Sequence, residues 1–160
     1  NGGWSMPSWY DILAMSPARA IDHAQLEESG EQLMQLIEQQ RDAGIDPHRI
    51  ILAGFSQGGA MAYTTGLAQP DTLAGIIALS TYIPSVDYLN EHRHPANQHT
   101  PVFAGHGEFD NIVPVALGQR AVDTLKAHGQ PVSWHTYPIM HAVCIEEIQA
   151  IGQWLRSVLK

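Results

Sequence analysis

The chain has few basic side chains, a single cysteine and no long apolar run. It carries 8 Lys and Arg against 16 Asp and Glu in 160 residues, a formal net charge of −8 at pH 7. This balance argues against binding to nucleic acid or to an anionic membrane, since both need a positive face. The lone Cys144 excludes an internal disulfide framework and a multi-cysteine metal site. No apolar run approaches the roughly 18 residues of a membrane-spanning helix, so we expect no membrane insertion.

What remains suits one folded domain with a substantial core. Hydrophobic residues make up 44% of the chain, too many for a disordered polypeptide. We therefore predict one domain over residues 1–160. No amino-terminal signal of basic residues followed by an apolar stretch is visible. We expect a cytoplasmic protein, and a start at Asn1 that is processed or cut.

Four short apolar runs predict the strands of a parallel sheet. These runs are residues 49–54, 73–80, 101–106 and 132–137. The first three lack strict alternation, which is typical of strands covered on both faces. Helix signals separate them: Ser16 and Pro17 predict a helix start, and Gly44 predicts its end. The apolar edge of this helix is formed by Leu33, Leu36, Ile37 and Gln40.

Three further helices complete an alternation of strand and helix. We predict them over residues 58–67, 115–128 and 144–159, the last with one apolar face formed by Ile148, Ile151, Leu155 and Val158. This order predicts an α/β fold, a mostly parallel sheet flanked by helices and joined by right-handed crossovers.

Residues 81–100 do not fit the alternation. The segment has no strong period and contains two prolines, and loops of about that length in compact domains tend to be functional or mobile. A short helix over residues 86–89 is an alternative. His92 and His94 could form a metal pair, but no clear third ligand follows, so we favour a solvated loop and expect no metal.

The run Gly54-Phe55-Ser56-Gln57-Gly58 joins a predicted strand directly to a predicted helix. In that context G-x-S-x-G is typical of a nucleophile elbow, which lifts a serine hydroxyl above the carboxyl end of the strand. We predict Ser56 as a nucleophile and the N–H of Gln57 as a donor to an oxyanion. The alternative is a glycine-rich turn with no chemistry.

A serine hydroxyl needs a general base and an acid that orients the base, in the chain order Ser, acid, His. Asp110 and Glu108 both follow the strand at residues 101–106. We prefer Asp110 because an apolar pair and Pro114 would pin its loop. Glu108 as the acid, and Asp110 as a helix cap, remain alternatives.

One of the nine histidines fits the position of the base. His141 follows Asp110 and lies on the loop after the last strand, whereas His106 ends a strand but precedes Asp110. A surface histidine near a helix start is the alternative for His141. Cys144 is interpreted as a small, partly buried apolar group.

These motifs resemble the phospholipase/carboxylesterase family of small α/β-hydrolases, which includes acyl-protein thioesterases. The resemblance covers essentially the whole chain and is strongest at residues 53–62, AGFSQGGAMA. Other matching segments are residues 8–12, 79–84, 106–114 and 140–143. The STYIP stretch within 79–84 is more similar to bacterial carboxylesterases than to eukaryotic thioesterases. Met140 stands where family members usually carry Gly.

The resemblance implies an α/β-hydrolase fold, a Ser56–Asp110–His141 triad and no cofactor. Its main implication is hydrolysis of carboxylic esters with short to medium acyl chains, with a small-molecule ester as partner. Acyl-protein thioesterase or lysophospholipase action is an alternative, as is an impaired chain that only binds ligand. Candidates for an acyl pocket are Trp9, Met61, Tyr82 and Ile83, although each is at least as well explained as core.

The start of the chain departs from the family. Members begin with further strands and a His-Gly-x-Gly loop that supplies a second oxyanion N–H, whereas this chain opens at Asn1. The resemblance implies that residues 1–160 form the C-terminal three quarters of the family domain. The absent strands should pair with residues 50–53, so we expect an exposed edge covered by a missing segment or by a homo-oligomer. Losing one oxyanion donor predicts a rate lower by about 10²–10³.

Overall fold

The centre of the computed structural model, which describes residues 6–14 and 20–159, is a four-stranded parallel sheet. Its strands are β3 (Ile51–Phe55), β4 (Gly75–Leu79), β5 (Val102–Gly107) and β6 (Val132–Tyr137), in the spatial order β3-β4-β5-β6. All three pairings are parallel. The four predicted strands are therefore confirmed, within two residues at each end.

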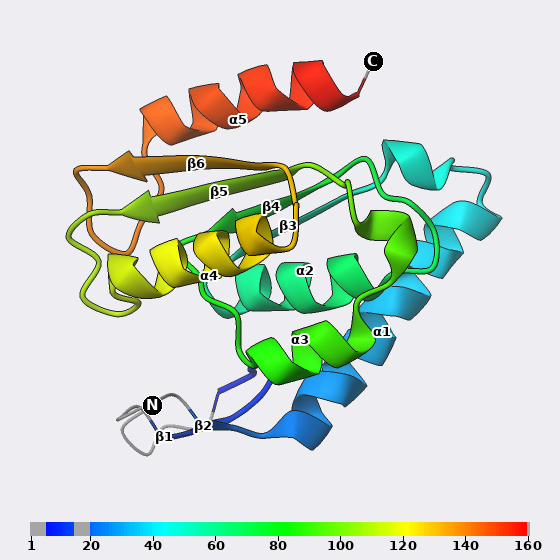
Figure 1. Cartoon of the computed structure of the whole chain (residues 1–160), viewed down its shortest axis with the longest axis horizontal. Helices are drawn as coiled ribbons and strands as arrows, with labels where there is room; N and C mark the ends of the chain where they lie inside the picture. Colours follow the sequence, from blue (N-terminus) through cyan, green and yellow to red (C-terminus); the bar gives the residue numbers. More distant parts are fainter. Residues whose placement is uncertain (1–5, 15–19, 160) are drawn as a thin grey trace.

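Helices cover both faces of this sheet (Figure 1). α2 (Gln57–Ala68) and α4 (Val115–Ala127) pack on one face, with α1 (His23–Asp42) and α3 (Val86–His92) beyond α2. α5 (Ile145–Val158) lies on the other face. The described part of the chain also contains two short 3-10 helices, Pro47–Arg49 and Pro95–Asn97. The predicted layered architecture is confirmed.

The core forms two apolar clusters on the α2 side of the sheet. One lies between the strands and α2 and α4, and includes Tyr63, Leu67, Ile76 and Leu125. The other lies between α1, α2 and the loops after β4 and β5, and includes Tyr10, Leu26, Met61, Tyr82 and Val113. Each large side chain buried in this way stabilises the fold by about 1.5–3 kcal/mol.

The start of α1 differs from the prediction. Ser16 and Pro17 lie outside the described residues, and Ala20–Ile21 forms a short strand, β2, paired antiparallel with β1 (Ile12–Ala14). A helix running on from Pro17 is therefore wrong. α1 begins at His23 because Asp22 caps it, accepting a hydrogen bond from the N–H of Gln25 at 3.0 Å. Its end before Gly44, which has φ +92°, is confirmed.

Residues 81–100 are more ordered than a mobile loop. α3 extends the alternative short helix to His92, and the buried Asn97 ties the far end of the segment to the core. The Asn97 amide donates to the carbonyl of Gln69 at 2.8 Å and to that of Asp71 at 2.9 Å. These bonds argue against mobility, because breaking them would leave buried polar groups unpaired.

The contact face of α5 differs from the prediction at Ile148. Ile148, assigned to the apolar face, is 59% exposed. Ile151, Leu155 and Val158 are half-buried, as the predicted face requires. The helix also meets the sheet through Glu147 and Trp154, and Trp154 packs on Phe103 with ring centroids 6.0 Å apart. Gly75 of β4 leaves room for the Trp154 ring, since a Cβ there would come within 2.5 Å of it.

β3 lies at the edge of the sheet and pairs with β4 alone among the described strands. Ala53 and Phe55 are exposed on it. This is the edge that we expected at residues 50–53. What covers it, whether a further segment or a second copy, stays a prediction.

We expect Gly75→Ala to lower the free energy of unfolding by about 1–3 kcal/mol, because the new methyl group must displace the Trp154 ring. Urea denaturation measures the loss. Gly30→Ala in α1 is the matched control: its Cβ would meet only Thr65 Oγ1 at 3.6 Å, so helix propensity should raise stability by up to about 1 kcal/mol. Equal effects of the two changes would contradict the proposed packing.

Candidate active site

Ser56 occupies a strained turn between β3 and α2. Its φ of 54° and ψ of −120° lie in a region that residues with a Cβ rarely adopt. Two hydrogen bonds hold the turn to the loop after β4. The N–H of Ser56 donates to the carbonyl of Leu79 at 2.8 Å, and the hydroxyl of Thr81 donates to the carbonyl of Ser56 at 2.6 Å. The local strain is therefore maintained by surrounding contacts.

Close approach of α2 to β3 explains two of the glycines around Ser56. A Cβ on Gly54 would overlap the carbonyl of Gly58, and one on Gly59 would come within 2.7 Å of Thr81 Cγ2. A Cβ on Gly58 would make only an ordinary contact, 3.7 Å from Trp9 Nε1. Lack of a side chain is thus required at Gly54 and Gly59.

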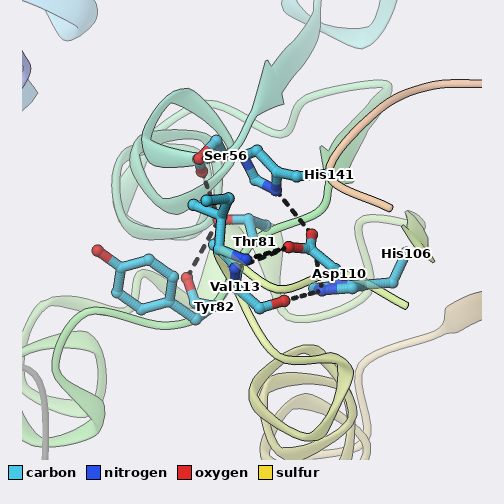
Figure 2. Close-up of polar contacts among 8 residues, drawn as sticks. Ser56, Thr81, Tyr82, His106, Asp110, Val113 and His141 are labelled. Atoms are coloured by element: carbon cyan, nitrogen blue, oxygen red, sulfur yellow. Dashed lines mark hydrogen bonds and ion pairs between the residues drawn. The ribbon is translucent and has the colours of Figure 1, made fainter. Parts of the chain in front are cut away.

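The three residues predicted for the triad form one line of hydrogen bonds (Figure 2). His141 Nδ1 lies 2.7 Å from Asp110 Oδ2, and His141 Nε2 lies 3.0 Å from Ser56 Oγ. Because an ionised carboxylate only accepts, Nδ1 carries the hydrogen, which leaves Nε2 to accept from the serine hydroxyl. This is the tautomer that a general base for Ser56 requires.

Asp110 is buried and held ionised by hydrogen bonds. Its side chain has no exposed surface, and Oδ1 accepts from the N–H of Ile112 at 2.9 Å and of Val113 at 2.8 Å. Burial by itself raises the pKa of Asp110, but the hydrogen bonds from His141, Val113 and Ile112 together outweigh it, so the pKa is lowered.

The alternatives for the acid are not supported by this geometry. Pro114, not Asp110, is the N-cap of α4. Glu108 is exposed and accepts a hydrogen bond from Thr136 Oγ1 at 3.0 Å. Asp110 is therefore the carboxylate that faces the imidazole of His141.

His106 supports the acid loop, a role that the sequence did not reveal. It is buried at the end of β5, and its Nε2 lies 2.8 Å from the Val113 carbonyl and 3.6 Å from Asp110 Oδ2. Burial lowers the pKa of His106, so the neutral ring donates to Val113. The chain-order rule set His106 aside as a base, but its place four residues before Asp110 could have indicated a supporting contact.

Phe55 contributes a second contact that sequence analysis missed. Its ring centroid lies 4.7 Å from that of His141, so the residue before the nucleophile packs against the base. Phe55 belongs to β3 and His141 to the loop after β6. The contact therefore joins the nucleophile strand to the base loop.

Gln57 opens α2, and N–H groups in the first turn of a helix have no partner within that helix. Its role as an oxyanion donor stays a prediction. The side chain has a separate, unpredicted role: Oε1 accepts from Trp9 N–H at 3.0 Å, and Nε2 donates to the Tyr10 carbonyl at 2.6 Å. Gln57 thus fastens residues 9–10 beside the turn.

The four candidates for an acyl pocket differ in burial: two are buried in the core and two are partly exposed. Met61 is 0% exposed and Tyr82 is also buried, with its hydroxyl 2.8 Å from that of Tyr10. These two belong to the core, the alternative that we left open. Ile83 is partly buried against the core, and Trp9 is partly exposed next to Gln57. A substrate contact for Trp9 or Ile83 stays a prediction.

Within residues 6–14 and 20–159, no three His, Cys, Asp or Glu side chains are grouped so that they could hold a metal ion. The rings of His92 and His94 bond locally, to the Tyr88 carbonyl at 2.8 Å and the Ala96 N–H at 3.2 Å. None of the described helices combines the length and the hydropathy needed to cross a membrane. The cytoplasmic location stays a prediction.

A parallel sheet with helices on both faces, together with a serine on a strained strand-to-helix turn, defines an α/β-hydrolase. The line of hydrogen bonds from Asp110 through His141 to Ser56 makes it one of the serine type.

Comparison with known proteins agrees with this class. The family model described as Phospholipase/Carboxylesterase matches residues 1–159. Acyl-protein thioesterase 1 of Mycosarcoma maydis is 39% identical over 99% of this chain and 72% of that protein. Acyl-protein thioesterase 1 of Neurospora crassa is 41% identical over 99% of this chain and 68% of that protein. The chain belongs to the phospholipase/carboxylesterase family.

Solved structures place the fold in the same family. SOBER1 of Arabidopsis thaliana superposes with a TM-score of 0.91 at 28% identity, over 99% of this chain and 77% of that one. Acyl-protein thioesterase 2 of Zea mays superposes with a TM-score of 0.83 at 25% identity, over 99% and 75%. The chain is therefore a serine hydrolase of the esterase and thioesterase type with the α/β-hydrolase fold.

Backbone strain at Ser56 can be measured directly. We expect Ser56→Gly to be more stable than Ser56→Ala by about 1 kcal/mol, because Gly adopts a positive φ without strain. Ser157 in α5 is the matched control, since Gly there should be less stable than Ala by about 1 kcal/mol. Thermal unfolding of the four variants tests this order, and finding Ala more stable than Gly at both positions would refute the strain at Ser56.

Proposed function

We propose that this chain hydrolyses acyl thioesters, and more slowly carboxylic esters, through an acyl-enzyme on Ser56. The observation that carries the proposal is the unbroken line from Asp110 through His141 to Ser56, with distances of 2.7 and 3.0 Å. The preference for thioesters rests on the relatives named acyl-protein thioesterase, which are 37–41% identical over nearly the whole chain.

Acylation begins when Ser56 Oγ attacks the carbonyl carbon of the ester. The hydroxyl proton passes to His141 Nε2 as the new C–O bond forms, and the carbonyl electron pair moves onto its oxygen. Asp110 accepts from Nδ1–H throughout and stabilises the imidazolium. The N–H of Gln57 donates to the oxyanion.

Collapse of this intermediate expels the leaving thiolate or alkoxide, which takes the proton from His141 Nε2. Water then repeats the sequence on the acyl-enzyme. His141 removes a proton from water, hydroxide adds to the acyl carbon, and the carboxylic acid leaves as Ser56 Oγ regains the proton. Two acyl transfers therefore use the same base and the same oxyanion donor.

Exposed apolar residues next to Asp110 and His141 in the sequence suit a substrate with an apolar acyl chain. Phe109 and Ile112 flank Asp110 and are 64% and 54% exposed, and Met140 precedes His141 and is 55% exposed. We call these three residues the apolar rim. We propose that they bind the acyl chain, since exposed apolar groups near a reactive centre are typical of a surface for apolar ligands.

Hydrolysis of carboxylic esters with short to medium chains is the second candidate. The same triad performs it, and the STYIP segment at residues 80–84 resembles that of bacterial carboxylesterases. A thiolate is the better leaving group, so catalysis of thioester cleavage depends less on proton donation by His141. Relative rates on matched esters and thioesters therefore separate the two candidates.

The nucleophile is tested with a fluorophosphonate probe and with an octanoyl thioester. We expect Ser56→Ala to abolish labelling and turnover, and Asp110→Asn to lower kcat by about 10⁴ because the imidazole loses its required tautomer. Mass spectrometry locates the label and thiol release measures turnover. Binding of the thioester by the unmodified chain without thiol release would favour the alternative that it only binds ligand, and labelling that survives Ser56→Ala would reject the proposal.

The apolar rim is tested with thioesters of increasing acyl length. Phe109→Ala and Met140→Ala should lower kcat/KM about tenfold for a twelve-carbon chain and little for a four-carbon chain, because burying each CH₂ contributes about 0.8 kcal/mol. Leu36→Ala on α1 is the control, an exposed leucine outside the rim. A loss that is the same for every chain length would show that the rim does not bind the acyl group.

A further inference from the structure

Glu147 is a buried carboxyl that the triad does not use. It lies in the first turn of α5, is 1% exposed, and is the buried residue of that helix. The backbone N–H of Cys144, the N-cap of α5, favours the ionised form of Glu147. This is the arrangement of a capping box, in which the side chain of the third helical residue faces the N-cap N–H. Neither carboxyl oxygen, however, has a partner in full hydrogen-bond geometry within the described part of the chain. Burying a carboxyl without such partners costs folding free energy, so its place in the structure needs a physical reason.

The carboxyl fits a gap in the centre of the sheet. A Cβ on Gly105 would overlap Glu147 Oε1, so the glycine makes the space that the carboxyl fills. Gly105 lies on β5 between Leu79 of β4 and His135 of β6. We call this space the Gly105 slot. It brings the first turn of α5 into contact with β5, the strand that leads to Asp110.

β5 also contacts the loop after β6, which carries His141. A Cβ on Gly107, two residues beyond Gly105 and hence on the same face, would overlap the carbonyl of Met140. The N–H of Phe109 donates to the carbonyl of Ile139 at 3.0 Å. Residues 139 and 140 therefore contact the end of β5 and the residues that follow it, just before His141. Glu147 contacts β5 on the other side of His141 in the chain.

We propose that Glu147 is a positioning residue for His141: its carboxyl, seated in the Gly105 slot, fixes the start of α5 so that the preceding loop holds the imidazole between Asp110 and Ser56. The inference rests on the proposed function, which makes His141 the base. Glu147 acts through the loop.

The charge state of Glu147 then determines how stably its carboxyl occupies the Gly105 slot. Burial raises its pKa from 4.5 to about 7, against the opposing effect of the Cys144 N–H. The ionisable groups near it are Tyr137 on β6, His135, which pairs with Gly105 in the sheet, Cys144 at the N-cap of α5 and Glu146 in its first turn. β4 and β5 present Leu79 and Gly105. Burial and the nearby Glu147 raise the pKa of Tyr137, so its phenol stays neutral beside the carboxyl.

The direction of the pH effect follows from the raised pKa. An acid whose pKa is higher in the folded state stabilises that state most below its unfolded value, here 4.5, and the stabilisation is lost as the pH rises through about 7. Above that pH a carboxylate is forced into the Gly105 slot, and the start of α5 loosens. Glu147→Gln keeps the shape of the neutral carboxyl and removes this pH dependence.

The experiment compares Glu147→Ala, Glu147→Gln and the neighbouring control Glu146→Ala, which changes an exposed residue of the same helical turn. We expect Glu147→Ala to lower the fluorophosphonate labelling rate and kcat about tenfold, with KM changed less than about twofold, because misplacing a catalytic group costs rate and not binding. Glu147→Gln should restore both, and its advantage over the unmodified chain should grow between about pH 6 and pH 8.

Nuclear magnetic resonance gives a second readout that a purely structural role would not move. The downfield proton of the His141 Nδ1–Asp110 hydrogen bond should weaken in Glu147→Ala and persist in Glu147→Gln and Glu146→Ala. Normal labelling by folded Glu147→Ala, or equal pH profiles for Glu147→Gln and the unmodified chain, would overturn the inference. If Glu147→Ala does not fold, the comparison of the pH profiles of Glu147→Gln and the unmodified chain decides the test. Failure of the proposed function is seen separately, as labelling that persists in Ser56→Ala.

Discussion

The strained turn at Ser56 is the constraint on which the site depends. A serine with φ of 54° persists because the Leu79 carbonyl, the Thr81 hydroxyl and the close packing of Gly54 on Gly58 all hold it. The turn aims the hydroxyl at His141 and starts α2 at the same point. Nucleophile and candidate oxyanion donor are therefore adjacent residues, and the rest of the fold brings the base and the acid to them.

Two buried carboxyls on opposite sides of the base loop show how surroundings set charge. Asp110 accepts three hydrogen bonds, and its pKa is lowered despite burial. Glu147 is equally buried without such partners, and its pKa is raised to about 7. The negative charge of Asp110 is thus favoured beside the imidazole of His141, and the negative charge of Glu147 is disfavoured where α5 meets the sheet.

The sequence motifs and the named relatives favour different details of the function. The sequence pointed first to carboxylic esters with short to medium acyl chains, whereas several relatives that cover nearly the whole chain are named acyl-protein thioesterase. The triad serves both reactions, and the apolar rim of Phe109, Ile112 and Met140 suits acyl chains from either. Met61, first considered for an acyl pocket, belongs to the core because it is enclosed on every side.

Residue order and local chemistry were enough to predict the four parallel strands and the residues Ser56, Asp110 and His141, because glycines, apolar runs and turn positions are local signals. They were not enough for His106 and Glu147, whose roles arise from contacts with Val113 and Gly105 across the fold. The start of α1 was missed because the Asp22 cap competes with an equally plausible signal at Ser16 and Pro17. Packing chooses between such local alternatives, since burial and hydrogen bonding depend on neighbours distant in the chain.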